Sequence, residues 1–369
     1  MLSGDGDLRE KYYHWLYHIE GIGSTSLKKI IKIADPKQIF QEGTGCLKGI
    51  LPEKKCEKIE SKRQKGLPEH LWEQLQKEKI SLSYYGGQTY PKKLLNIPDP
   101  PLILYQKGRN NLWKKPSVAV VGARNCSLYG KQMAQRLGKE LAKNKIIVIS
   151  GMARGIDGIS QWAALEEGGE SVAVLGSGVQ ICYPPENRGL YFRLQEEGAL
   201  LSESLPYTAP AAGLFPRRNR LISGLADILV VVEAREKSGT LITVDMALEQ
   251  GKEVYCIPGR VTDDLSKGCN SLIKMGAGMI FSIEQFVEEI CPQLKVQYQG
   301  EKERHKQGLS EQEQQIVSVM ETTPLFVEEI FHRIQEKTRG LSFRELMEVL
   351  MDLQLRGKVA QQGQSYYLL

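Results

Sequence analysis

The fold is decided by Val118-Ala-Val-Val-Gly-Ala-Arg124, in which four apolar residues end at a glycine. A helical pattern follows over residues 130–141. Similar apolar runs recur at 146–149, 172–175, 227–232 and 253–256, each leading into a glycine-containing turn. Short continuous apolar runs that alternate with helices are typical of buried parallel strands. The sequence therefore predicts an α/β fold with a Rossmann-like, doubly wound, mostly parallel sheet.

The chain has 369 residues, which predicts two or three domains. The expected parts are a helical domain (1–79), a connecting segment (80–115), the Rossmann-like domain (116–291), a flexible linker (292–308) and a C-terminal domain (309–369). The linker is inferred from Pro292 and the polar composition that follows it.

Composition indicates a soluble protein of the cytoplasm. No apolar run approaches the ~20 residues of a membrane span, and no signal peptide is recognisable. The seven cysteines form no CxxC pair, which favours reduced thiols over a disulfide framework. All five histidines lie outside the sheet domain, so the usual general base and metal ligand are missing there. We therefore expect no catalytic residue, no metal and no cofactor.

Charge is unevenly distributed along the chain. Residues 1–115 carry a net charge of +8, whereas residues 116–290 carry −2 and residues 292–369 carry −1. An anion that binds the sheet domain must therefore meet a local cluster of cations.

Such a cluster is present in Phe215-Pro-Arg-Arg-Asn-Arg220, which opens an apolar helical pattern. A phenylalanine stacks on bases, arginines pair with phosphates, and an asparagine bonds a base edge or a sugar. Arg124 follows the first strand and is expected to bind a phosphate, with a surface salt bridge as the alternative. Asp157 is interpreted as a helix cap or an arginine partner instead of a catalytic acid.

The N-terminal region contains two short helical patterns on either side of Gly21-Ile-Gly23. This spacing resembles a helix-hairpin-helix (or SAM-like) domain, whose turn contacts a DNA phosphate. A plain α-hairpin that only packs a small helical domain is the favoured interpretation, because a single such turn is a weak signal.

The C-terminal region shows helical patterns at 311–320, 327–336 and 342–356, followed by two extended runs around Gly363. This order predicts a winged helix, with a three-helix bundle as the alternative. Glu345, Glu348 and Asp352 form an acidic stripe on the third helix. We therefore expect this domain to contact protein or to pack, and not to bind duplex DNA.

Several motifs, taken together and in this order, resemble the bacterial DNA-processing protein A family (DprA/Smf). They are Gly122-Ala-Arg124, Ser150-Gly-Met-Ala-Arg-Gly-Ile-Asp157, Gly176-Ser-Gly178 with Tyr183-Pro184 and Asn187, Phe215-Pro-Arg-Arg-Asn-Arg-Leu-Ile222, Ser238-Gly-Thr-Leu-Ile-Thr243, Pro258-Gly259 and Gly268-Cys-Asn270. The resemblance implies a protein that binds single-stranded DNA, protects it and helps to load the RecA recombinase during natural transformation. It also implies a homodimer through the Rossmann-like domain.

The motifs give the nucleic-acid-binding residues that we expect from the sequence. They are Arg124, Ser150, Gly151, Gly176, Ser177, Gly178, Phe215, Arg217, Arg218, Asn219, Arg220, Ser238, Gly239, Thr240 and Asn270.

Two enzyme classes are the alternatives to a DNA-binding protein. The sheet also resembles lysine-decarboxylase-like nucleotide phosphoribohydrolases, but their glycine turn is followed at once by catalytic glutamates. Here no carboxylate follows Thr240 until Asp245. A dinucleotide-dependent oxidoreductase is less well supported, because the first strand lacks GxGxxG. The sequence favours a binding protein that is not an enzyme.

Overall fold

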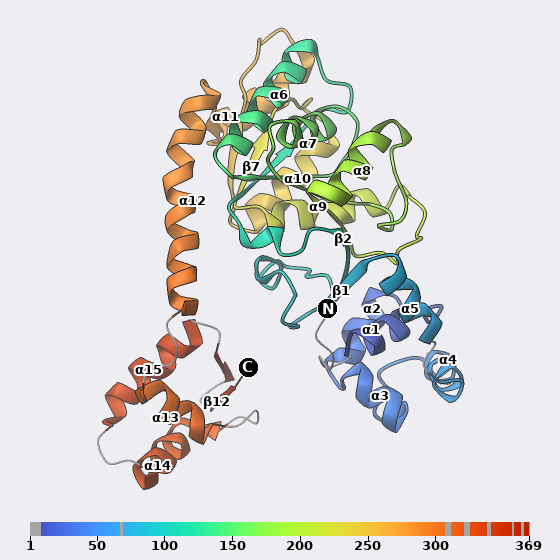
Figure 1. Ribbon diagram of the computed structural model, residues 1–369, viewed down its shortest axis with the longest axis vertical. Helices are drawn as coiled ribbons and strands as arrows, with labels where there is room; N and C mark the ends of the chain where they lie inside the picture. Colours follow the sequence, from blue (N-terminus) through green and yellow to red (C-terminus); the bar gives the residue numbers. More distant parts are fainter. Residues whose placement is uncertain are drawn as a thin grey trace. The chain divides into compact units, whose positions relative to one another are not determined.

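A computed structural model describes residues 9–66, 69–306, 311–320, 325–337, 341–355, 358–362 and 365–368 (Figure 1). The chain divides into two compact units, Met1–Leu294 and Lys295–Leu369. No helix among the described residues is long and apolar enough to cross a membrane.

The first unit is built on a nine-stranded sheet, in the order β1-β2-β6-β5-β4-β3-β7-β8-β9. The strands are β1 (Ile80–Tyr84), β2 (Ile103–Gly108), β3 (Ser117–Val121), β4 (Ile147–Ser150), β5 (Ser171–Val174), β6 (Ala199–Ser202), β7 (Ile228–Val231), β8 (Glu253–Cys256) and β9 (Gly278–Met279). The pairs from β6 through β9 are parallel, and β2 joins β6 antiparallel. This confirms the predicted Rossmann-like, mostly parallel sheet.

Helices cover both faces of this sheet (Figure 1). They are α6 (Leu128–Lys143), α7 (Ile156–Glu166), α8 (Arg188–Glu197), α9 (Leu214–Leu225), α10 (Gly239–Glu249), α11 (Asp264–Lys274) and the first part, 283–294, of α12 (Ile283–Lys306). Alternate residues of β3 enter different cores. Val118 packs with Leu137 of α6, whereas Ala119 packs in the core that holds Leu221 of α9. Strands buried on both faces explain the continuous apolar runs in the sequence.

Chain order reverses between β3 and β7. From β3 the chain builds β4, β5 and β6 on one side, and it then returns to place β7, β8 and β9 on the other. In open α/β sheets a ligand crevice forms outside the carboxyl ends of the strands at such a point. The fold therefore predicts a site beyond Val121 and Val231.

The N-terminal helices pack directly on the sheet. They are α1 (Arg9–His18), α2 (Ser24–Ile31), α3 (Pro36–Glu42), α4 (Glu53–Gln64) and α5 (Glu69–Lys77). Leu16 and Leu27 share one hydrophobic core with Tyr105 of β2 and Leu200 of β6. The helices and the sheet therefore belong to one compact unit.

Two sequence-based expectations differ from the structure. Residues 80–115 were expected to be a connecting segment, but they contribute β1 and β2 to the sheet because 102–105 is a fully buried apolar run. Residues 292–308 were expected to be a linker, but α12 continues through Pro292 to Lys306. Burial of Cys291 and Leu294 holds the helix around the proline. Glutamate, lysine, arginine and glutamine, which favour helix, continue it.

The second unit contains α13 (Glu311–Val319), α14 (Val327–Lys337) and α15 (Phe343–Leu355). Three short antiparallel strands accompany them in the order β10 (Leu325–Phe326), β12 (Ser365–Leu368), β11 (Val359–Gln362). The unit has its own apolar core, which includes Ile316, Ile330 and Leu350. The three helices and two extended runs occur as predicted, while the turn at Gly363 lies outside the described residues. The winged-helix assignment stays a prediction.

Candidate functional site

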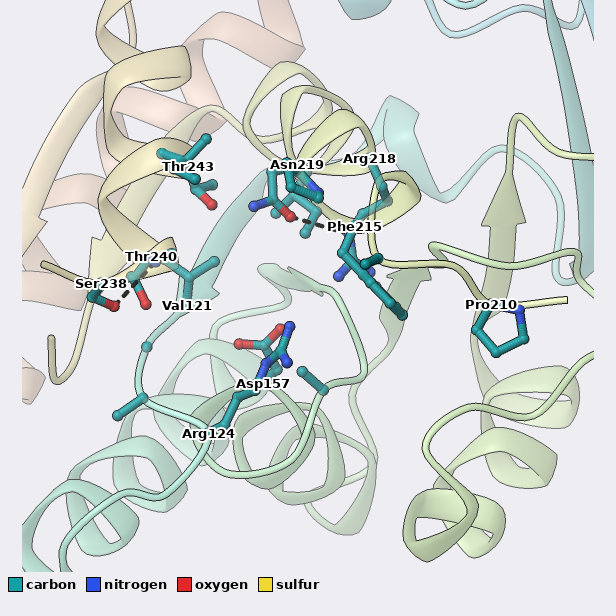
Figure 2. Close-up of a pocket in the computed structure, with 18 of the residues that line it drawn as sticks. Val121, Arg124, Asp157, Pro210, Phe215, Arg218, Asn219, Ser238, Thr240 and Thr243 are labelled. Carbon is teal, nitrogen blue, oxygen red and sulfur yellow. Dashed lines mark hydrogen bonds between the residues drawn. The ribbon is translucent and has the colours of Figure 1, made fainter.

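A cavity of about 720 Å³ lies at the reversal point of the sheet (Figure 2). It is lined by Val121, Gly122, Ala123, Arg124, Ala153, Asp157, Tyr183, Pro210, Ala211, Ala212, Phe215, Pro216, Arg218, Asn219, Ile222, Ser238, Gly239, Thr240, Ile242 and Thr243. These residues come from the end of β3, from the segments that follow β3, β4, β5, β6 and β7, and from helices α7, α9 and α10. Segments far apart in the sequence therefore meet at the edge where the fold predicts a ligand.

Seven of the predicted binding residues line this cavity: Arg124, Phe215, Arg218, Asn219, Ser238, Gly239 and Thr240. Figure 2 shows Phe215, Arg218 and Asn219 along one side of the cavity and Arg124 with Asp157 across from them.

Phe215 presents an aromatic surface in the cavity. Its ring lies against Tyr183, with centroids 5.4 Å apart and planes tilted by 35°, and the Arg124 guanidinium carbon is 5.8 Å from its centroid. A Cβ on Gly176 would come within 2.6 Å of Phe215 Cδ1, so only glycine leaves room for the ring in this position. Gly176, which follows β5, therefore packs against the Phe215 ring and does not line the cavity itself.

Arg218 is a buried cation at the cavity wall. Its Nη1 donates to the carbonyl oxygens of Gly151, at 2.9 Å, and of Val174. A Cβ on Gly151 would lie 2.6 Å from the guanidinium, so this glycine makes room for the arginine. Burial lowers the pKa of Arg218 to about 10, although nearby Asp157 acts in the opposite direction. The side chain stays protonated at neutral pH and supplies a fixed positive charge.

Asp157, in the first turn of α7, is the acidic partner in this site. Its Oδ2 accepts a hydrogen bond from the Gly151 amide at 3.1 Å. Burial raises the pKa of its carboxyl group, and the charge of Arg218 opposes that shift. Of the described residues that line the cavity, it is the one carboxylate, against the two cations Arg124 and Arg218.

Arg124 is the cation that faces solvent. It is exposed, and among the described residues it makes no hydrogen bond or ion pair. The alternative of a surface salt bridge is therefore not found there. An exposed, unpaired guanidinium beside an aromatic ring is suited to a phosphate group.

The remaining predicted residues fall outside the cavity, and several have structural partners. Ser150 is fully buried, and its hydroxyl donates to the Val120 carbonyl at 2.6 Å. Ser177 is also buried, and a Cβ on Gly178 would collide with the backbone of Leu205 and Pro206. Asn270 bonds both backbone groups of Gly259, at 3.2 and 3.0 Å. These residues have structural partners in this fold, and their contact with a ligand stays a prediction.

Arg217 and Arg220 lie outside the cavity for a geometric reason. Residues 215–220 open helix α9, as expected, and side chains three residues apart on a helix share one face. Arg220 is buried, with Nη2 2.7 Å from Glu203 Oε2 and Nε 3.2 Å from Asp99 Oδ2. Arg217, on the same face, pairs with Glu203 at 3.1 Å. Arg220 is therefore a structural ion-pair partner, and Arg217 lies outside the cavity.

Sequence reasoning missed several lining residues. Tyr183 stood in a recognised motif but was not assigned to the site, and Pro210–Ala212 carried no signal. Asp157 was given a structural role, which its hydrogen bond to Gly151 supports. Helical periodicity applied to 214–225 would have separated Arg218 and Ile222 from Arg220.

A second acidic residue near the sheet edge, Glu233, has a structural partner. Glu233, buried after β7, accepts hydrogen bonds from the amide and hydroxyl groups of Ser127, the N-cap of α6. Within the described ranges, no cluster of three or more His, Cys, Asp or Glu side chains has the placement of a metal site.

Comparison with known proteins identifies the family. The family model described as DNA recombination-mediator protein A matches residues 81–291. The chain belongs to this family. Within it, the chain is 43% identical over 214 residues to the DNA processing protein DprA of Bacillus subtilis, covering 58% of this chain and 72% of that protein. It is 32% identical to Protein Smf of Synechocystis over 287 residues, covering 75% and 72%.

Solved structures of the family share the fold. The X-ray structure of DprA from Streptococcus pneumoniae matches with a TM-score of 0.65 and 32% identity, covering 76% of this chain and 97% of that chain. DprA from Helicobacter pylori matches with a TM-score of 0.54 and 31% identity, covering 58% and 97%. The latter structure is described as showing a single-stranded DNA binding mode. The resemblance inferred from the sequence motifs is thus confirmed.

Proposed function

We propose that this protein binds single-stranded DNA, with little sequence preference, in the cavity at the carboxyl edge of its sheet. The observation that carries the proposal is the Phe215 ring, held on Gly176 between Tyr183 and the exposed Arg124. An aromatic surface accepts any base, and adjacent guanidinium groups neutralise the backbone. The single-stranded DNA binding mode described for the Helicobacter pylori relative supports the same conclusion.

The same surface is poorly suited to duplex DNA. The aromatic ring and the cations lie within a cavity of about 720 Å³, whereas duplex readout requires an element that enters a groove. Unstacked bases reach such a cavity, and paired bases do not.

We also propose that the protein protects the strand and helps to load the RecA recombinase during natural transformation, as a homodimer through its Rossmann-like domain. The family description as a recombination mediator supports this role. Its test is RecA filament assembly on a strand coated with single-strand-binding protein. The proposal requires faster assembly with this protein, and an unchanged rate contradicts it.

We propose that the protein is not an enzyme. A nucleotide phosphoribohydrolase needs a free carboxylate at its substrate, but Asp157 is bonded to Gly151 beside Arg218, and Asp245 is not among the lining residues. Incubation with nucleoside monophosphates should yield no free base. Release of base at a rate proportional to protein concentration would favour the enzyme.

Cross-linking tests where the strand binds. Bromodeoxyuridine oligonucleotides irradiated with the full-length protein should join to the peptide that contains Phe215 or the one that contains Tyr183. Cross-links confined to residues 311–368 would place the strand on the second unit and contradict the proposed site.

A further inference from the structure

The N-terminal helices carry positive charge that the proposed cavity does not use. Residues 9–66 contain 13 lysine and arginine residues against seven aspartate and glutamate residues, a net charge of +6. The sheet domain over residues 116–290 has a net charge of −2. Most of the positive field of this unit therefore originates beside the cavity-bearing domain, where it attracts an anionic polymer.

Helix α4 sorts its charges onto two faces. At about 100° per residue, Lys54, Lys58, Lys62 and the C-cap Lys65 fall within about 80° of its circumference, and we call them the lysine face. Glu53, Glu57 and Glu60 form a separate stripe that lines a different hollow with Thr44 and Lys48. If the lysines and glutamates of this helix neutralised each other, charges of both signs would alternate along one face. In α4 the two signs lie on different faces.

The lysine face is not committed to protein partners. Lys54, Lys62 and Lys65 are exposed, and their side chains make no hydrogen bond or ion pair with any described residue. Lys58 Nζ lies 3.6 Å from Glu20 Oε2 and donates to the Glu20 carbonyl oxygen at 3.5 Å, but both side chains are exposed, at 52% and 95%. Such a solvated pair contributes little to stability, so a polyanion competes with it easily.

Contacts connect this face to the cavity. Lys55, at the border of the lysine face, donates to Ser26 Oγ of α2 at 2.6 Å. Two residues earlier, Ser24 Oγ accepts from Arg217 at 2.6 Å. Arg217 belongs to α9, the helix that presents Phe215 to the cavity. The order of contact from the cavity outward is therefore α9, α2 and α4.

The turn between α1 and α2, just before Ser24, is exposed at its two glycines. A Cβ on Gly21 or Gly23 would meet nothing within 4 Å. The turn also contains the exposed carboxylate of Glu20, which lies 3.6 Å from Lys58 Nζ, so a lysine of the face offsets its negative charge.

We propose that the lysine face binds phosphates of the DNA single strand that leaves the cavity, as a second subsite for the same ligand. The inference rests on the proposed function and extends it. A helix of 12 residues is about 18 Å long, so the face lengthens the footprint by a few nucleotides. Lysines give point-charge contacts to phosphates and read no bases, so the subsite adds affinity without sequence preference.

The test compares two triple variants of the full-length protein with equal loss of charge. Lys54→Gln/Lys62→Gln/Lys65→Gln removes most of the lysine face. Lys48→Gln/Lys114→Gln/Lys139→Gln removes three other exposed lysines and serves as the control. Each protein is titrated with oligothymidylates of about six and about 25 nucleotides at several salt concentrations.

The proposal predicts that only the lysine-face variant loses affinity for the long oligonucleotide. Its salt slope should fall by about 2, because each of the three lost phosphate contacts contributes about 0.7. Its affinity for the short oligonucleotide should equal that of the wild type. Equal behaviour of both variants on the long strand overturns the proposal, and so does a loss confined to duplex of the same length. If the wild-type protein binds neither oligonucleotide, the proposed function itself fails.

Discussion

Replacing Phe215 with alanine tests whether bases stack in the cavity. Stacking on an aromatic side chain contributes about 1–3 kcal/mol per base, so Phe215→Ala should weaken single-strand binding by about 5- to 150-fold. The salt slope should not change, because a neutral ring releases no counterions. Binding is measured by fluorescence anisotropy with a labelled oligothymidylate.

Gly176→Ala provides the matched perturbation, because it displaces the ring without removing it. The added Cβ would approach Phe215 Cδ1 to 2.6 Å, so the ring must move from its place beside Tyr183 and Arg124. We expect a loss of affinity comparable to that of Phe215→Ala. In the double variant the glycine substitution should add little, since no ring remains to be displaced.

Folding must be compared before affinity is interpreted. The Phe215 ring is only partly buried, so its removal should cost less than the roughly 3–5 kcal/mol of a core phenylalanine. Denaturant midpoints of the variants give this control. A Phe215→Ala variant that folds and binds oligothymidylate as tightly as the wild type would refute the stacking argument.

Three further predictions concern other parts of the chain. Arg220→Ala should destabilise the fold by about 3 kcal/mol, the lower end for a buried ion pair, because it removes the buried guanidinium that joins Glu203 and Asp99 and leaves Glu203 with Arg217 alone. Arg124→Ala should preserve stability and reduce the salt slope by about 0.7; denaturant unfolding and anisotropy separate the two, and a reduced slope only in Arg220→Ala would contradict the assignment. Burial, reinforced by His18, lowers the pKa of His14 to about 3, so the unfolded chain binds the proton first and stability is lost as pH falls below about 6.5; unfolding measured at about pH 7.5 and 5 should show roughly 2 kcal/mol less loss for His14→Gln than for wild type, and equal losses would contradict this. The fragment 309–369 should show no measurable duplex binding at physiological salt, and its deletion should leave single-strand affinity nearly unchanged; tight duplex binding in a gel-shift assay would contradict the charge argument.

Local sequence patterns were sufficient to predict the parallel strands and the edge at which a site forms. The runs ending at Val121 and Val231 are apolar because both faces of the sheet are covered, and the turns beyond them converge for topological reasons. Both features, the buried strands and the sheet edge, can be read from short runs of consecutive residues.

The roles of individual site residues depended on contacts that no local pattern contains. Arg218 and Arg220 are two positions apart and chemically identical, yet one faces the cavity and the other pairs with Glu203. Asn270 was expected at the ligand, and the structure shows its side-chain amide hydrogen-bonded to both backbone groups of Gly259, 11 residues away. Tertiary contacts decide which side chain pairs with another part of the protein and which one stays available at the cavity. The three-dimensional structure is needed to see these contacts.

The glycines illustrate the same distinction. Gly151 and Gly176 were expected to approach the ligand with their backbone; the structure shows that they make room for Arg218 and Phe215, and the ligand contact stays a prediction. A glycine at a strand end indicates that another group comes close to its backbone. The sequence around it does not specify whether that group is a ligand or a side chain.

Single-strand binding is distinguished from duplex binding by titrating the full-length protein with a labelled oligothymidylate and with a duplex of equal length over a series of salt concentrations. We expect much tighter binding of the single strand, with affinity falling by about 0.7 log units per log unit of salt for each phosphate contact. Equal affinity for the duplex, or binding to the single strand that does not respond to salt, would contradict this expectation.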